Sequence, residues 1–200
     1  MHLKKLLEFS TALFDSKPRA AACAIKGMGM DILDQFYGFL PDDRIGLYNE
    51  MADKAMDLGF KPKLDKTKHL SVSFISSAYK ITILRFIYEK NVPAYRLKFF
   101  ASHDYSSVFD QSIKKTIEKY NFKYVGCYKC GKCKDELEGY RVEYEDGRGY
   151  FRCGFELIEI IDLNEQVKDE VVKLMERQAE YCVNKKAASA KVRFEPKDMR

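Results

Sequence analysis

The sequence predicts an α+β fold in which a helical N-terminal segment precedes a mainly antiparallel sheet with covering helices. Three observations predict it. Apolar residues recur at helical spacing up to about residue 60. Short runs of β-branched and aromatic residues, separated by turn residues, then predict strands. Between two groups of such runs lies a cysteine cluster, which predicts a four-cysteine metal knuckle.

The composition is that of an ordinary globular protein with a substantial core, with 46% hydrophobic and 32% charged residues. The net charge of +5 is spread through the chain and does not by itself indicate a nucleic-acid partner. Glu8 interrupts the first apolar run, and no uncharged stretch approaches membrane-spanning length, so we expect a cytoplasmic protein without membrane contact. In a reducing compartment, six cysteines favour metal ligands or buried thiols over disulfides.

We expect three parts along the chain. Residues 1–60 form a helical N-terminal segment, residues 61–183 an α+β domain that carries the metal site, and residues 184–200 a basic tail. In the first part, apolar spacing predicts helices over 2–15 and about 20–40. A third helix is predicted over Asp42–Leu58, with Gly59 as its C-cap, because glycine readily takes the left-handed conformation found there.

The first group of strands follows a linker at 61–68. Residues 70–74 alternate apolar residues with serine, while 81–88 and 94–100 are rich in β-branched and aromatic residues. The turn residues 89–91 predict that the last two strands form a hairpin. A helix should follow from near Ser106, since its apolar residues recur at helical spacing.

That helix has a predicted capping box, in which Ser107 lies three residues before Asp110. After the cysteine cluster, the same order of strands and helix returns. The predicted elements are strands at 140–144, 150–153 and 155–161, a turn at Asp146-Gly147, and a helix capped by Asn164. The strands and helices before and after the cysteine cluster come in a similar order, but their residues do not match, so the sequence contains no repeat there.

The cysteine cluster contains Cys127, Cys130 and Cys133, and a fourth cysteine, Cys153, follows the predicted hairpin. Two cysteines separated by two residues let a tight turn aim both sulfurs at one ion, and Gly131 permits the turn. The hairpin would return the chain so that Cys153 completes a tetrahedron. We therefore expect one zinc ion, structural rather than catalytic because four thiolates leave no open coordination position.

Residues 127–131 resemble the Cys-x-x-Cys-Gly knuckle of zinc ribbons and rubredoxins over these few positions. A ribbon has a second Cys-x-x-Cys pair, whereas here Tyr150 precedes Cys153, so Cys133 must complete the ligand set. The alternative is an iron–sulfur cluster, because three cysteines at this spacing and a remote fourth are similar to the ligands of single-cluster ferredoxins. Gly154, rather than the proline usual there, makes zinc the preferred reading.

Several lysines lie close to the cysteine cluster in the sequence and suggest a surface that binds nucleic acid or another partner. The contact residues would be Lys129, Lys132, Lys134 and Tyr128. Lysine could meet phosphates and tyrosine could stack on bases. The competing explanation is that the lysines offset the formal charge of about −2 of a zinc ion with four thiolates.

No catalytic motif is recognisable, so the sequence leaves open whether the protein is an enzyme. His69 and His103 are candidates for an acid–base pair only if the fold brings them together. Cys182 lacks a partner at metal spacing and is expected to be a buried apolar residue. Thirteen tyrosines and a curved sheet favour an aromatic-lined pocket. The expected function is therefore a zinc-stabilised module that binds a small organic ligand or a protein partner.

Overall fold

The computed structural model describes residues 32–131, 133 and 136–193, with side chains to residue 188. The helix predicted over 2–15 and the first part of the one over 20–40 lie outside these residues. From Ile32 onward the described chain belongs to one compact unit. It combines helices with antiparallel strands, which confirms an α+β fold.

Two helices open this unit. They are α1 (Ile32–Tyr37) and α2 (Asp42–Asp57), the second as expected from its apolar spacing. Gly59 follows the end of α2 with a φ of 82°, a left-handed conformation that glycine adopts without a Cβ clash. The buried side of α2 includes Tyr48 and Met51, which leaves its acidic residues outside.

The main sheet has five antiparallel strands in the order β1-β2-β3-β4-β7. Their bounds are β1 Lys61–Leu64, β2 Leu70–Ser76, β3 Ile81–Glu89, β4 Val92–Leu97 and β7 Ile158–Glu159. The prediction of a linker over 61–68 is therefore wrong, since its first half is an edge strand. Lys-Pro-Lys-Leu lacks β-branched residues, and its extended form comes from pairing with β2.

The predicted hairpin between β3 and β4 is confirmed. Lys90 and Asn91 form a two-residue loop with φ values of 53° and 61°, as a type I′ turn requires. The second strand ends at Leu97, whereas the sequence predicted residue 100. The chain leaves the sheet there because Phe99 packs among the rings of Tyr105, Phe109 and Tyr140.

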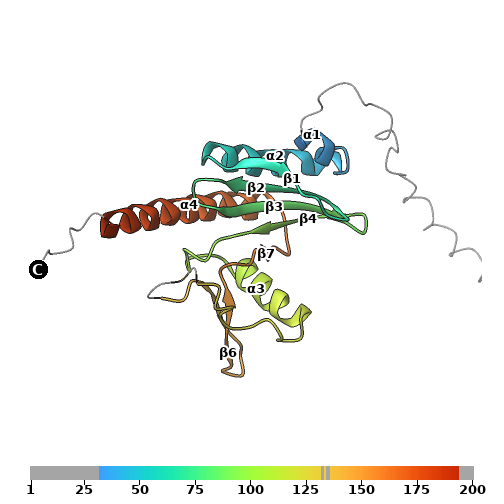
Figure 1. Ribbon diagram of the computed structural model, residues 1–200. Helices are drawn as coiled ribbons and strands as arrows, with labels where there is room; N and C mark the ends of the chain where they lie inside the picture. Colours follow the sequence, from blue (N-terminus) through green and yellow to red (C-terminus); the bar gives the residue numbers. More distant parts are fainter. Residues whose placement is uncertain (1–31, 132, 134–135, 194–200) are drawn as a thin grey trace, which may run out of the picture. The chain divides into compact units, whose positions relative to one another are not determined.

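Helices α1 and α2 cover an aromatic face of the sheet. Phe86 lies at its centre, 5.3 Å from Phe36 and 4.8 Å from Tyr48 between ring centroids. Figure 1 shows α2 over the strands and the long helix α4 (Glu165–Arg193) running along the sheet. Asn164 caps α4 as predicted, because Val167 N donates to Asn164 Oδ1 at 3.0 Å.

A small second sheet consists of β5 (Gly139–Glu143) and β6 (Gly149–Cys153), and it lies against α3 (Ser107–Lys119). Asp146-Gly147 forms its hairpin tip, as predicted; Gly147 has a φ of 80°. The predicted capping box is absent, because Ser106 is the N-cap of α3 and makes no side-chain cap bond.

The strand predicted over 155–161 is shorter than expected and joins the other sheet. Only β7 is extended there, and Ile158 pairs with Leu97 of β4. The tail predicted from residue 184 begins inside α4, which continues to Arg193. Among the described helices, none is long and apolar enough to cross a membrane.

Candidate functional site

The β5–β6 hairpin returns the chain to the cysteine loop. Gly139, at the start of β5, pairs with Cys153 at the end of β6. Gly126 forms a parallel bridge with Arg152 and donates its N–H to Phe151 O at 2.7 Å. This isolated bridge places the residues that directly precede Cys127 and Cys153 side by side.

Two backbone N–H groups of the loop lie near cysteine sulfurs. Lys129 N lies 3.3 Å from Cys127 Sγ, and Glu138 N lies 3.5 Å from Cys133 Sγ. Lys129 and Gly131 have φ values of 50° and 72°, which turn the backbone tightly.

The four predicted ligands differ in exposure: Cys130 is exposed, Cys127 and Cys133 are half-buried, and Cys153 is buried. Within residues 32–131, 133 and 136–193, no three His, Cys, Asp or Glu side chains are grouped closely enough to hold a metal ion. Assignment of the four cysteines to one ion stays a prediction.

A cavity of about 620 Å³ adjoins this loop, a volume within the range of small-molecule sites. Its walls come from the start of β3, the end of β4, the segment after β6, the cysteine loop and α4. Three predicted ligands line it, namely Cys130, Cys133 and Cys153. Cys182 of α4 lines the same cavity, although its isolated position in the sequence gave no reason to place it there.

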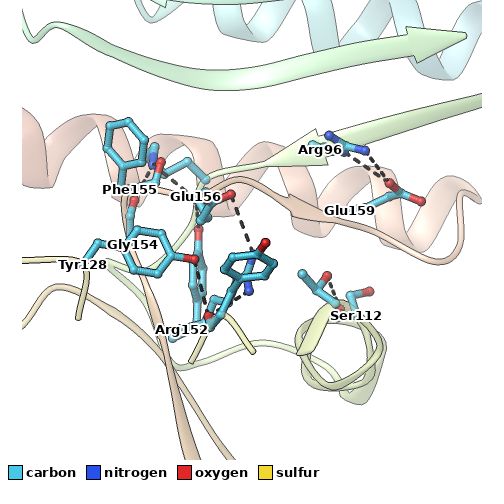
Figure 2. Close-up of polar contacts among 12 residues, drawn as sticks. Arg96, Ser112, Tyr128, Arg152, Gly154, Phe155, Glu156 and Glu159 are labelled. Atoms are coloured by element: carbon cyan, nitrogen blue, oxygen red, sulfur yellow. Dashed lines mark hydrogen bonds and ion pairs between the residues drawn. The ribbon is translucent and has the colours of Figure 1, made fainter. Parts of the chain in front are cut away.

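Two arginines face each other across β3 and β4 in this cavity wall. Arg85 pairs directly with Arg96, an arrangement of like charges that is unfavourable unless each has a partner. Arg85 Nε lies 3.3 Å from Asp65 Oδ2. Arg96 donates through Nε and Nη2 to Glu159 Oε2, at 3.2 and 3.0 Å (Figure 2). The two-residue loop at 90 and 91 fixes this pairing, so counting back from the turn could have found it.

Lys98 is a buried cation at the end of β4, only 5% exposed. Its ammonium donates to three consecutive carbonyls, those of Gly154, Phe155 and Glu156. The bond to Phe155 O measures 2.9 Å and that to Glu156 O measures 3.3 Å. Lys98 thereby fixes the turn that follows Cys153 and forms one wall of the cavity.

Helix α4 supplies the opposite wall. Ala101 N donates to Gln178 Oε1 at 3.1 Å, and Lys185 pairs with Glu138. Burial raises the pKa of the Cys182 thiol above its ordinary value, an effect that the Gln178 side chain and the charge of Lys98 partly oppose. Burial, followed by a hydrogen bond with Glu138, also raises the pKa of Tyr181. Both groups are therefore neutral near pH 7.

The predicted nucleic-acid contacts are only partly within the described chain. Tyr128 is 37% exposed and Lys129 is exposed, whereas Lys132 and Lys134 lie outside the described residues. The two histidines lie at opposite ends of β4. His69 pairs with Glu89 at 3.7 Å beside the β3–β4 turn, and exposed His103 follows the far end of β4. They therefore do not form the acid–base pair considered above.

The sequence thus led to the cysteine loop, and the fold adds the cavity beside it. The cavity carries more basic than acidic side chains, with Glu138 and Glu156 as its only carboxylates among the described residues. Its apolar part includes Phe100 and Leu157. Such a lining suits a small organic molecule that carries negative charge. Comparisons with protein families, with curated proteins and with solved structures find no match.

Proposed function

We propose that this chain is a binding module in which the cavity beside the cysteine loop takes a small organic anion and a zinc ion holds one wall of that cavity. Cys127, Cys130, Cys133 and Cys153 would be the zinc ligands. With four thiolates the ion would be structural. It would fasten the hairpin over 139–153 and the cysteine loop against the α3 side of the molecule.

The observation that carries the ligand proposal is the Arg85–Arg96 pair in the cavity wall. Arg85 uses its Nε for Ser73 and Asp65, and Arg96 uses its Nε and Nη2 for Glu159. The remaining N–H groups of the two guanidinium groups would be donors for a carboxylate, sulfonate or phosphate, and the apolar side chains beside them would contact its organic body. The metal proposal is supported by the parallel bridge beside Cys153 and by the N–H groups directed at Cys127 and Cys133.

The ligand proposal is tested by titrating the full chain with the anionic aromatic probe 1-anilinonaphthalene-8-sulfonate and following its fluorescence. Arg85→Gln should weaken binding by about ten- to a hundredfold, because a charged hydrogen bond contributes about 1.5–3 kcal/mol. The matched control is Arg141→Gln, an exposed arginine of β5 outside the cavity. Thermal melts of both variants establish that each is folded.

A second variant, Ala78→Trp, narrows the cavity from its exposed rim without removing a charge. It should also weaken probe binding. Equal affinities for the parent chain, Arg85→Gln and Ala78→Trp would overturn the ligand proposal. Probe binding that falls equally with Arg141→Gln would show a general charge effect instead.

The metal proposal predicts about one zinc per chain after purification under reducing conditions, as measured by elemental analysis. Cys153→Ser should lose the metal, because only three of the four thiolates that complete the tetrahedral site would remain. Cys182→Ser is the matched control, since Cys182 is buried and lines the same cavity but is outside the proposed ligand set. Equal metal content in both variants would contradict the assignment, and strong visible absorption with bound iron would favour the iron–sulfur alternative.

Chelation should loosen only part of the molecule. The core of the main sheet is apolar and independent of the cysteines, so removal of the metal should not unfold the chain as it unfolds isolated zinc fingers. Hydrogen exchange should quicken over about 124–155. Unchanged protection there would reject the proposed fastening role, even if zinc is present.

A further inference from the structure

A second cavity, of about 350 Å³, lies between α3 and the segment around β7. Helix α3 and the residue after it contribute Lys115, Lys119 and Tyr120. Arg152, at the end of β6, also lines this cavity. The cavity is distinct from the larger one but adjoins it, because Arg96, Glu156 and Leu157 line both.

Arg152 is buried without a full set of partners. It is 3% exposed, and its Nη1 donates to Tyr124 O at 2.9 Å. Its guanidinium lies 5.4 Å from the centre of the Tyr120 ring. The nearest carboxylate oxygen, Glu156 Oε2, lies 3.8 Å from Nη2, which is an ion pair but too long for a hydrogen bond (Figure 2). Among the described residues, Arg152 Nε has no hydrogen-bond partner.

Arg96 shows what the missing partner would be. Its Nε and Nη2 form one edge of the guanidinium plane, and both donate to a carboxylate oxygen of Glu159. In Arg152, the same edge has no hydrogen bond to any described residue. Buried polar groups normally have partners, and this edge of a guanidinium matches two oxygens of a carboxylate or phosphate.

We propose that the second cavity binds a phosphate group, with Arg152 as its buried donor and the exposed Lys115 and Lys119 as further cations. Among the described residues, three carboxylates also line this cavity, those of Glu118, Glu156 and Glu159. Glu159 pairs with Arg96 at 3.0 Å and with Lys119 at 3.8 Å, and Glu156 pairs with Arg152 at 3.8 Å, so these two oppose an incoming anion less than free carboxylates would. This site does not depend on the ligand proposed for the larger cavity. Because the cavities adjoin, the phosphate is either free or carried by an organic molecule that also enters the larger one.

The test uses the full chain and inorganic phosphate, with sodium chloride replacing phosphate at equal ionic strength as the reference. Phosphate should raise the melting temperature, because a ligand that binds only the folded state stabilises it. Lys115→Gln and Lys119→Gln should each weaken apparent phosphate affinity, by about two- to fivefold, as expected for exposed charges. Lys123→Gln is the matched control, an exposed lysine close in sequence that does not line the cavity.

Arg152→Lys keeps the charge but removes the planar edge, and should weaken phosphate binding by about tenfold or more. If Arg152→Lys does not fold, the phosphate affinities of Lys115→Gln and Lys119→Gln test the proposal. The proposal is overturned if phosphate stabilises the chain no more than chloride, or if Lys123→Gln weakens binding as much as Lys119→Gln.

Phenyl phosphate distinguishes the two sources of the phosphate group. A free-phosphate site should bind it no more tightly than phosphate. A site for an organic phosphate should bind it more tightly, and Ala78→Trp in the larger cavity should then remove that gain while leaving inorganic phosphate binding intact. Binding of inorganic phosphate is measured separately from binding of the sulfonate probe. Phosphate binding without probe binding would contradict only the proposed function, and probe binding without phosphate binding would contradict only this proposal.

Discussion

The ammonium of Lys98 neutralises the negative ends of three peptide dipoles at one turn. Burying a cation is unfavourable unless it is hydrogen-bonded, and here each donor of the ammonium has a carbonyl acceptor. The arrangement links the end of β4 to the chain that follows Cys153. A lysine in an otherwise apolar strand end therefore holds together two parts of the molecule that are distant in sequence.

We expect Lys98→Met to lower the free energy of unfolding by about 1–3 kcal/mol, because it leaves buried carbonyl groups without their donor. Urea denaturation measures this loss. Lys80→Met is the control, since Lys80 lines the same cavity but is exposed. If both variants lose the same small amount, the Lys98 contacts contribute little to stability.

At the level of elements, close packing around the β5–β6 hairpin determines which residues can follow Cys153. Gly154 N donates to Glu138 O at 2.8 Å, which brings the two ends of the hairpin together. A Cβ at position 154 would lie 2.7 Å from Phe100 Cδ1 and 2.9 Å from Glu138 O. Proline is also unsuitable there because it lacks the N–H.

Gly154→Ala should therefore destabilise the protein by about 1–3 kcal/mol, the usual range for overpacking. Gly149→Ala, on the same hairpin, is the matched control because its Cβ would meet nothing within 4 Å. Thermal and urea denaturation of the two variants compare them directly. A Gly154→Ala variant as stable as Gly149→Ala would show that the Phe100 ring can move away from the new Cβ at little cost in stability.

For the whole molecule, stability should fall in alkaline solution because several tyrosines are buried. Burial raises the pKa of Tyr140 and of Tyr95 above the ordinary value of 10.0. Between that value and the higher folded pKa, the unfolded chain releases these protons more readily, so unfolding becomes more favourable as pH rises. The stability conferred by the neutral phenols is complete below about pH 9 and declines above about pH 10.

Urea midpoints at pH 8, 10 and 11 measure this decline. Tyr140→Phe should be less stable than the parent at pH 8, since the phenol accepts from Phe99 N and donates to Glu156 O, but its decline above pH 10 should be shallower. Tyr124→Phe removes a surface phenol for comparison. A decline equally steep in Tyr140→Phe would assign alkaline unfolding to other groups.

The sequence predicts those parts of this fold whose signals are local. Helix α2, the β3–β4 hairpin, the turn at Asp146-Gly147 and the Asn164 cap depend on neighbouring residues, and all are present. Strand β1 and the pairing of β7 with β4 depend on distant partners, so composition did not indicate them. The cysteine loop stood out by spacing, whereas the cavity needs α4 and β4 to meet, which spacing within one segment cannot show.

The composition of the cavity wall also bears on the synthesis of the chain. The strands and the cysteine loop precede α4 in the sequence, yet Gln178, Tyr181, Cys182 and Lys185 of that helix complete the wall. On a ribosome, the sheet and the thiols emerge before the helix that covers them. During that interval the thiols of the cysteine loop would be open to metal or oxidant, and the cavity wall would stay incomplete until α4 has been added.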